Sequence, residues 1–351
     1  MIRIGKFTDF YSDVTKMGTK IPQERYLSKG QFPIIDQGRQ TIAGRWDDED
    51  GIFSDVPAIV FGDHTRAIKY IEEPFFIGAD GVKILRPKNT QDSPKYLFYA
   101  LQAARIPDLG YSRHFKAVKE LDIRVCSKEE QAEIVRILES IDFLIEKRHE
   151  EVRYLDQAVK SRFIELFGDP IDNTMGLKTI PLGEACFLKA GITTAADAIH
   201  EQSAVYPVPC YGGNGIRGYV KEATQHGCYP IIGRQGALCG NVQMATGEFH
   251  ATEHAVLVTP LIETNVVWLF HLLRMMDLYR FHTGAAQPGL AVKTLNTVDI
   301  PIAEIAVQNN FASFVEQTDK SKYYSSLSFR YCQAAANTYR QEWMTCRTSD
   351  F

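Results

Sequence analysis

The chain has 351 residues, 45% of them hydrophobic and 23% charged, so it is long enough for two domains with separate cores and too apolar for a disordered protein. Its seven cysteines form no Cys-x-x-Cys pair, and their odd number favours a reducing cytoplasm over a disulfide framework. The start of the chain lacks the apolar stretch of a secretory signal, and no run of residues suits a membrane span. We therefore expect a cytoplasmic protein without a membrane partner.

The formal net charge of −4 argues, at face value, against a nucleic-acid partner. The distribution of charge weakens that argument, because residues 1–126 carry 19 Lys and Arg against 17 Asp and Glu. Basic residues clustered on one face, or positive charge supplied by a partner, would still allow contact with duplex DNA. Composition alone leaves DNA binding open.

Residues 1–126 are predicted to form a mixed α/β domain. Strand-length runs rich in β-branched and aromatic residues occur at 32–35, 58–61 and 81–85, separated by Gly, Pro and Asp. Residues 94–102 have helical composition and begin with a Ser-Pro pair, which is typical of a helix start.

A long helix is predicted over residues 127–168. Ser127 and Glu130 have the spacing of a capping box, and neither glycine nor proline interrupts the chain again before Gly168. About 40 residues of helix would be roughly 60 Å long at 1.5 Å per residue. Apolar residues alternate at intervals of three and four, as in a coiled coil, with Arg148 and Arg162 on the same stripe. The apolar positions predicted to pack are Ile134, Leu138, Ile141, Ile145, Val152, Leu155 and Val159.

The second half of the chain repeats the first at an offset of about 171 to 177 residues. Residues 169–304 are predicted to form a connection and a second mixed domain, and residues 305–347 a second long helix. Ile42 and Gly44 reappear as Ile216 and Gly218. Adding 177 to the first helical stripe gives a second stripe, polar in its middle, whose predicted packing residues are Phe311, Val315, Phe329, Tyr339 and Trp343.

The predicted fold is therefore α+β, with two similar mixed α/β domains joined by two long antiparallel coiled-coil helices in a pseudo-twofold internal repeat. Because the second stripe is polar in its middle, its best partner is the more apolar first helix of the same chain. The alternative is that each helix packs only on its own domain, which a helix of this length would outrun.

The sequence contains two patterns that resemble catalytic or metal-binding motifs, but the residues around each pattern do not suit that role. His250, Glu253 and His254 spell an H-x-x-E-H zinc pattern, but the flanking residues indicate a strand, in which Glu253 would point away from both histidines. The glycine-rich residues 233–240 lack the Gly-Lys-Ser/Thr ending of a phosphate loop. We expect no metal site and no catalytic residues in this chain.

The chain resembles the DNA-specificity subunit of type I restriction-modification systems. The resemblance is carried by residues 121–134, which run from a strand into the first long helix with Glu130-Gln131, and by their counterpart 298–311 with Gln308. Residues 163–184, from the end of that helix through Gly168-Asp169-Pro170, resemble the family's connection to its second target-recognition domain. The order, duplication and spacing of these segments cover almost the whole chain.

The resemblance implies that each target-recognition domain reads one half of a split double-stranded DNA sequence, while the helix pair fixes the unread spacer. It also implies that the helices dock two methyltransferase subunits, and that restriction subunits with motor and nuclease activity join the complex. The cofactors S-adenosylmethionine and ATP with Mg²⁺ are expected in those partners and none in this chain.

Turn residues with arginine, glutamine, asparagine or other polar side chains are the candidates for DNA contact, since these groups bind base edges and phosphates. In the first domain they are Gln37, Arg39, Gln40, Arg45, His64, Thr65, Arg66, Arg113, His114 and Lys116. In the second they are Asn214, Arg217, Arg234, Gln235, Gln287 and Lys293.

Two other functions remain as alternatives. The negative net charge favours a coiled-coil scaffold that binds proteins through its repeated domains and makes no contact with DNA. The histidine pattern at 250–254 leaves a zinc enzyme as the third hypothesis.

Overall fold

A computed structural model describes residues 2–78, 80–110, 112–284 and 288–344. The chain divides into two compact units, the first made of Met1–His149 with Ser326–Phe351 and the second of Glu150–Ser325. Two helices of 40 residues, α4 (Lys128–Phe167) and α8 (Ile305–Met344), each contribute one end to each unit. Among the described residues, no helix combines the length and apolarity needed to cross a membrane.

The first unit contains sheets of four, three and two strands, with orders β2-β8-β5-β6, β4-β3-β7 and β1-β9. Their bounds are β1 (Arg3–Lys6), β2 (Tyr11–Asp13), β3 (Phe32–Ile35), β4 (Gly44–Trp46), β5 (Ala58–Gly62), β6 (Ile68–Ile71), β7 (Phe76–Ile77), β8 (Val82–Pro87) and β9 (Asp122–Val125). The shorter helices are α1 (Phe7–Phe10), α2 (Pro94–Ala103) and α3 (Phe115–Val118). The predicted strands and the predicted helix of this domain are confirmed.

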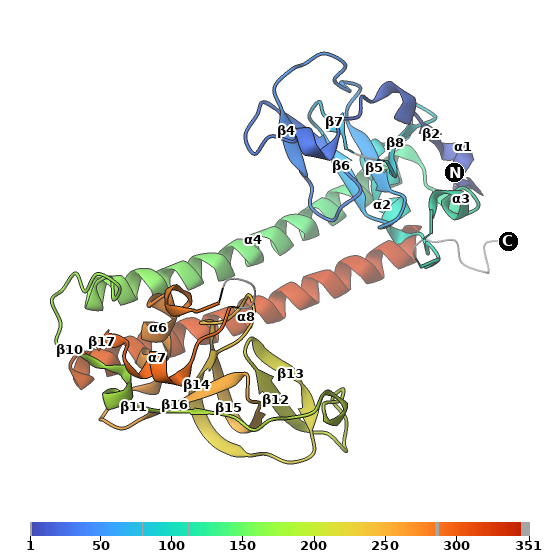
Figure 1. The fold of residues 1–351 in the computed structure, drawn as a ribbon. Helices are drawn as coiled ribbons and strands as arrows, with labels where there is room; N and C mark the ends of the chain where they lie inside the picture. Colours follow the sequence, from blue (N-terminus) through green and yellow to red (C-terminus); the bar gives the residue numbers. More distant parts are fainter. Residues whose placement is uncertain (1, 79, 111, 285–287, 345–351) are drawn as a thin grey trace. The chain divides into compact units, whose positions relative to one another are not determined.

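The second unit contains a six-stranded sheet of order β11-β16-β14-β15-β12-β13 and a two-stranded sheet β10-β17. Their bounds are β10 (Thr179–Pro181), β11 (Cys186–Ala190), β12 (Val208–Gly212), β13 (Gly215–Val220), β14 (Gln225–Gly233), β15 (Val242–Ala251), β16 (Ala255–Pro260) and β17 (Asp299–Pro301). The shorter helices are α5 (Leu182–Ala185), α6 (Val266–Met275) and α7 (Val292–Asn296). Figure 1 shows α6 and α7 at one end of the six-stranded sheet.

The repeat is visible in the pairing of strands. In the first unit, β1 pairs with β9 and β3 runs parallel to β7; in the second, β10 pairs with β17 and β12 runs parallel to β15. The second sheet extends further because β14 and β15 have 9 and 10 residues, whereas β5 and β6 have 5 and 4. The two mixed α/β domains thus share this pattern of strand pairing. They differ in the length of one hairpin, which is β5–β6 in the first unit and β14–β15 in the second.

The predicted capping box starts α4. The Glu130 carboxylate accepts a hydrogen bond from the Ser127 backbone N–H at 2.9 Å, and Ser127 Oγ accepts one from the Glu130 N–H at 3.4 Å. This pair satisfies two N–H groups that a helix start would otherwise leave without partners. The helix ends at Phe167 because Gly168 follows in the left-handed region, with φ of 72°.

The two long helices pack antiparallel in each unit. In the first unit, Met344 and Tyr339 of α8 belong to the core that contains Ile134 and Leu138 of α4, and His149 lies 4.3 Å from Phe329 between ring centroids. Residues further along α4 therefore contact residues nearer the start of α8, as in an antiparallel pair.

The second unit continues this order. Asp156 pairs with Lys322 at 2.8 Å, and further along α4 the ring of Phe163 meets Phe311 edge to face at 5.4 Å between centroids. The expected antiparallel pair is confirmed, and the alternative in which each helix packs only on its own domain is wrong.

The predicted stripe of α4 faces inward. Ile134, Leu138 and Val159 are buried, and the remaining apolar positions Ile141, Ile145, Val152 and Leu155 are half-buried. On α8, Phe311 and Val315 are buried, and Phe329 and Tyr339 are half-buried.

Trp343 departs from the prediction for the α8 stripe, because it is 43% exposed while its neighbour Met344 is buried in the first core. A helix of 3.6 residues per turn drifts against a strict heptad count, and the drift is greatest at the far end of the stripe. Met344 therefore takes the packing place predicted for Trp343.

Candidate nucleic-acid interface

In each unit the backbone of one loop passes close to a glycine that ends a central strand. The glycines are Gly62 at the end of β5 and Gly233 at the end of β14. A Cβ atom on Gly62, the last residue of β5, would lie 2.7 Å from the backbone oxygen of Gln37. A Cβ atom on Gly233, the last residue of β14, would lie 2.2 Å from the backbone oxygen of Gly213. Both glycines are thus required by the crossing, and the loops around them bring many of the predicted polar residues together.

The crossing in the second unit borders an open cleft with a volume of about 600 Å³. One wall is the β12–β13 hairpin, residues 212–217, and the other is the loop 235–238 with His254. Three predicted residues, Asn214, Arg217 and Gln235, line this cleft and are exposed.

These three side chains form a suitable set for nucleic-acid contact. Asn214 Oδ1 accepts a hydrogen bond from Asn241 Nδ2 at 2.5 Å, which orients its amide. Since an amide oxygen has two lone pairs, Asn214 retains capacity to accept from a ligand as well as to donate. A guanidinium and two amides on one surface offer the donors and acceptors that bidentate contacts with purine bases require.

Glu253 adds a negative charge beside the cleft. Burial acts to raise the pKa of Glu253, but its backbone hydrogen bonds, one of them from the Thr194 N–H, and the charges of His254 and Arg217 leave that pKa lowered overall. Glu253 Oε1 also lies 3.2 Å from His254 Nε2. The carboxylate of Glu253 therefore stays ionised at neutral pH.

The other predicted residues of the second unit have different surroundings. The half-buried Arg234 joins neighbouring segments through its backbone, donating to the His254 carbonyl at 3.1 Å and accepting from the Leu290 N–H at 2.8 Å. Lys293 is exposed on α7, and Gln287 lies outside the described residues.

In the first unit the corresponding turn residues bind to the protein itself. Gln37 is half-buried; its side-chain oxygen accepts from the His64 N–H at 3.3 Å, and its backbone oxygen accepts from the Thr65 hydroxyl. Arg66, with φ of 59°, pairs through Nη2 with Asp108 Oδ2 at 2.7 Å. The Gly110 N–H, first, and then the Arg66 charge lower the pKa of Asp108. These residues hold the loops against one another.

His114 does not suit the predicted contact with DNA. It is 1% exposed, its Nδ1 lies 2.9 Å from the Asp63 carbonyl oxygen, and its Nε2 accepts from the Leu109 N–H at 3.1 Å. Because a base could reach this ring only if the loop unfolded, we remove His114 from the candidates.

Arg45 also has a structural role within the first unit. Its Nη1 donates to the carbonyl oxygens of Gly30 and Gln31 at 3.2 and 3.4 Å, so part of its guanidinium is already occupied. Of the predicted residues of the first unit, Arg39, Gln40, Arg113 and Lys116 are exposed, as is Thr65, whose hydroxyl donates to the Gln37 backbone oxygen.

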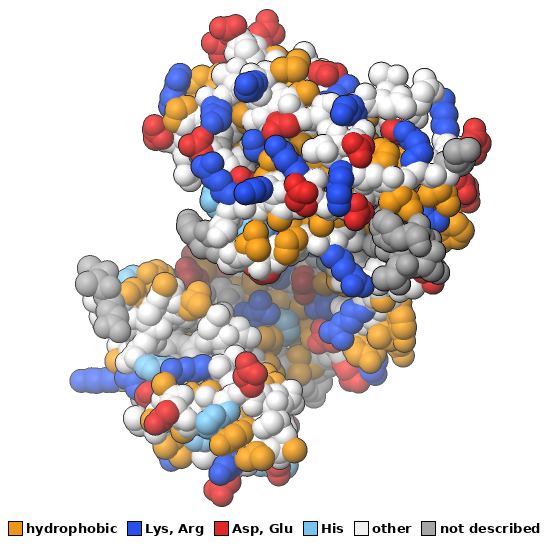
Figure 2. Space-filling model, turned by 90° about the vertical axis from the view of Figure 1, so that its right-hand side faces the viewer, with side chains coloured by type: hydrophobic (Ala, Val, Ile, Leu, Met, Phe, Trp, Pro, Cys, Tyr) orange, Lys and Arg blue, Asp and Glu red, His pale blue; other side chains and the backbone are white. Residues whose placement is uncertain are grey.

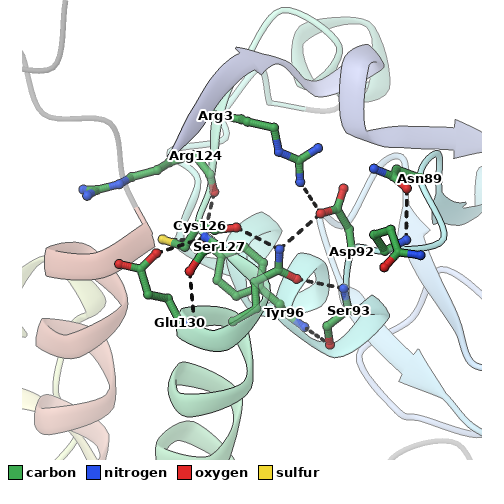
Figure 3. Close-up of polar contacts among 11 residues, drawn as sticks. Arg3, Asn89, Asp92, Ser93, Tyr96, Arg124, Cys126, Ser127 and Glu130 are labelled. Atoms are coloured by element: carbon green, nitrogen blue, oxygen red, sulfur yellow. Dashed lines mark hydrogen bonds and ion pairs between the residues drawn. The ribbon is translucent and has the colours of Figure 1, made fainter. Parts of the chain in front are cut away.

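A glutamine at the start of each long helix was missed as a key residue. Gln131, 2% exposed, accepts from the Ser93 N–H at 2.8 Å and donates to the Cys126 carbonyl at 3.0 Å and to Asp92 Oδ1 at 3.1 Å. Figure 3 shows the surrounding contacts, with Arg3 reaching Asp92 from the first strand.

Gln308 repeats this clamp in the second unit. It is 1% exposed, accepts from the Asn265 N–H at 2.9 Å and donates to the Ala303 carbonyl at 2.8 Å. Ser93 and Asn265 are the N-caps of α2 and α6, so each glutamine ties a long helix to the helix of its neighbouring domain. The 177-residue offset between the glutamines was the signal in the sequence that identifies this role.

The histidine pattern lies partly in a turn, contrary to the expectation of a continuous strand. His250 is in β15, whereas Glu253 and His254 form the turn before β16. His250 Nε2 contacts Thr194 Oγ1 at 2.8 Å, and burial lowers the pKa of His250. Among the described residues, no group of three or more His, Cys, Asp or Glu side chains is arranged to hold a metal ion.

Surface charge is mixed in the first unit. Figure 2 shows Lys and Arg side chains interspersed with Asp and Glu over the part of the molecule at the top of the view. Nucleic-acid binding by such a surface depends on a few placed side chains more than on a broad basic field.

Comparisons with known proteins agree with the geometry. Residues 6–154 match the family model described as the type I restriction modification DNA specificity domain. The EcoprrI specificity subunit of Escherichia coli is 39% identical over 194 residues, which are 54% of this chain and 48% of that one. A putative specificity subunit of Haemophilus influenzae is 29% identical over 112 residues, 31% of this chain and 29% of that one. The chain thus matches about half the length, or less, of these curated relatives.

The fold likeness extends over the whole chain. The crystal structure of the S subunit of a type I restriction-modification system from M. genitalium covers 99% of this chain and 97% of its own, with a TM-score of 0.63 and 17% identity. The comparisons thus place similarity to the type I restriction modification DNA specificity domain in residues 6–154, and similarity of fold to an S subunit over the chain as a whole.

Proposed function

We propose that this chain recognises a bipartite sequence in double-stranded DNA, with one recognition domain for each half. The observation that carries the proposal is the open cleft of the second unit, where Asn214, Arg217 and Gln235 come together on exposed loops. These side chains match the hydrogen-bonding groups on the major-groove edges of bases. The match of residues 6–154 to the DNA specificity domain, and the similarity to a curated specificity subunit, support the same function.

In the first domain the proposed contacts are Arg39, Gln40, Arg113 and Lys116, which are exposed. The internally bonded residues Gln37 and Thr65 serve to hold the loops that present them. Arginine and glutamine in this set suit base edges, and lysine suits phosphates.

The pair of long helices is proposed to fix the length of the unread spacer between the two half-sites. Its support is the antiparallel packing of α4 and α8 within each unit and the length of 40 residues of each helix. Inserting one heptad after Val152 in α4 and one at the facing position of α8 would add about 10 Å. We expect the recognised spacer to lengthen by about three base pairs at 3.4 Å each, with unchanged half-sites. Altered half-sites would contradict this division of roles.

Two methyltransferase subunits are the proposed partners of the helix pair. The first unit has a groove of about 930 Å³ between the start of α2 and the first turns of α4, and Phe143 and Leu144 at its end are exposed. The second unit has a groove of about 820 Å³ between α6 and α8, with exposed Tyr323 and Tyr324. Related grooves in both units suit two copies of one partner.

The chemistry of the complex is assigned to the partners. Methyltransferase subunits would supply adenine methylation with S-adenosylmethionine, and restriction subunits would supply cleavage with ATP and Mg²⁺. The chain itself supplies recognition in this proposal, which places it in the cytoplasm with the cell's DNA.

Binding of the full chain with its methyltransferase partner to random duplexes tests the proposal. We expect an affinity that falls steeply as salt rises, because phosphate contacts release counterions. A stable complex with the partner that shows no salt-dependent duplex binding would favour the protein scaffold instead.

A further inference from the structure

Two exposed isoleucines occupy corresponding positions of the sequence repeat, one in each recognition domain. Ile42 is 36% exposed and Ile216 is 53% exposed, and each lies two residues before a glycine of the returning strand, Gly44 or Gly218. A single exposed apolar residue needs no explanation, but a repeated one on a loop rich in polar side chains does.

The strand residues that follow the two glycines are equivalent in three dimensions. Arg45, just after Gly44, exchanges two backbone hydrogen bonds with Leu27 at 2.9 and 3.0 Å. Tyr219, just after Gly218, exchanges two with His200, both at 2.9 Å.

The glycines themselves pack in the same way. A Cβ atom on Gly44 would lie 2.7 Å from Tyr26, and one on Gly218 would lie 2.4 Å from Ile199. The returning strands of both hairpins are therefore fixed by the same backbone pairing from Gly44 and Gly218 onward. Ile216 lies within β13, opposite Tyr211, and Ile42 lies in the longer loop that leads into β4.

Each isoleucine follows an exposed amide by two residues, Gln40 before Ile42 and Asn214 before Ile216. In the second unit both members line the cleft, and Leu238, 52% exposed, adds an apolar side chain on the opposite wall. An A·T pair presents in the major groove the N6 and N7 atoms of adenine, which an amide binds bidentately, and the methyl group of thymine, which apolar side chains contact.

We propose that Ile42 and Ile216 each pack against the 5-methyl group of a thymine, in an A·T pair whose adenine is bound by Gln40 or Asn214. The proposal rests on the DNA recognition proposed above and gives it a chemical readout. Each half-site then contains at least one A·T pair read in this way, and removal of one thymine methyl weakens binding about threefold to fourfold.

The test uses the full chain with its methyltransferase partner and a duplex selected from a random pool. Each thymine of that duplex is replaced in turn by deoxyuridine, which lacks only the methyl group, and the affinity is measured at fixed salt. We expect one sensitive position or more in each half-site. Ile216→Ser should weaken binding to the thymine duplex by a similar factor and abolish the deoxyuridine effect in one half-site only, and Ile42→Ser should do so in the other.

Ile171→Ser provides a matched control, because Ile171 is 39% exposed in the connection of the second unit and belongs to neither hairpin. This variant should bind like the unaltered chain and keep both deoxyuridine effects. A selected half-site without an A·T pair, or salt-dependent binding that ignores every deoxyuridine, would overturn the inference and leave the proposed function standing. Absence of salt-dependent binding to any duplex would overturn both.

Discussion

The two units use the same loop crossing for different purposes. In the first unit the side chains at the crossing turn inward, as Gln37 does on His64 and as the 1% exposed His114 does on Asp63. In the second unit the crossing borders an open cleft that Arg217 and Gln235 line.

The repeat therefore preserves the path of the backbone, while the side chains at equivalent positions have different roles in the two units. Gly62 and Gly233 are required by the crossing in both units, whereas the residues beside them have separate roles. Equivalent positions therefore predict where a recognition surface lies and do not predict which side chains form it.

The largest effect is expected at the part that the units share. Gln131→Ala and Gln308→Ala each remove the partner of one backbone N–H and one backbone carbonyl, so each should lower the free energy of unfolding by about 3 to 4 kcal/mol. Glu129→Ala, an exposed change beside the first clamp, should stay within about 0.5 kcal/mol. Urea unfolding measures all three, and a large loss for only one glutamine would mean that the clamps are not equivalent.

His114→Ala should reveal the inward role of the first unit's loops. Loss of the ring removes a partner of the Leu109 N–H and the Asp63 carbonyl, so we expect destabilisation of about 3 kcal/mol. Arg113→Ala, one residue earlier and exposed, should leave stability nearly unchanged and weaken DNA binding instead. Thermal unfolding of the two variants distinguishes these roles, and equal melting temperatures would contradict the assignment of His114.

A pH-dependent stability is expected in the second unit. Burial, followed by the charge of Arg274, lowers the pKa of His271 on α6 to about 4. Between pH 6.5 and 4 the unfolded chain binds a proton that the folded chain does not, so stability is complete above about pH 7 and is lost as pH falls. The loss should reach about 2 kcal/mol near pH 4.5.

Position 271 corresponds to Tyr99 on α2 of the first unit, which carries no such titration in this range. Urea unfolding of His271→Phe from pH 7.5 to 4.5 should therefore show a shallower dependence than the unaltered chain. Identical pH dependence of the two proteins would show that His271 is not the source.

The smallest effect is expected at a surface pair of the first unit. Arg66→Ala removes the ion pair with Asp108, which is exposed to solvent, and should cost less than about 1 kcal/mol. The cost should shrink further in 0.5 M salt, since salt screens exposed charges. A loss that persists unchanged in high salt would indicate that Arg66 acts through its backbone position instead.

Sequence reasoning predicted the elements whose signals are local. The capping box at Ser127 and Glu130 and the helix end at Gly168 follow from short-range backbone chemistry. The packing stripe of α4 followed from its periodicity, because a helix fixes the direction of its side chains.

The direction of side chains in turns was not predictable in the same way. His114 and Arg113 are neighbours in a loop of similar composition, yet one is buried and the other exposed, because long-range contacts with Asp63 decide the conformation. Trp343 and Met344 differ because a helix of 3.6 residues per turn drifts against a strict heptad count, so that Met344 and not Trp343 reaches the first core. The predicted contact residues in the cleft remain predictions until DNA binding is measured.

The central claim is that each recognition domain reads one half of the target, and the double variant Arg217→Ala with Gln235→Ala tests it most directly. The chain is expressed with its methyltransferase partner, and the methylated sequences are mapped beside those of the unaltered complex. We expect relaxed sequence preference in one half-site, with the other half-site and the spacer unchanged. Changes in both half-sites, or an unchanged target, would contradict it.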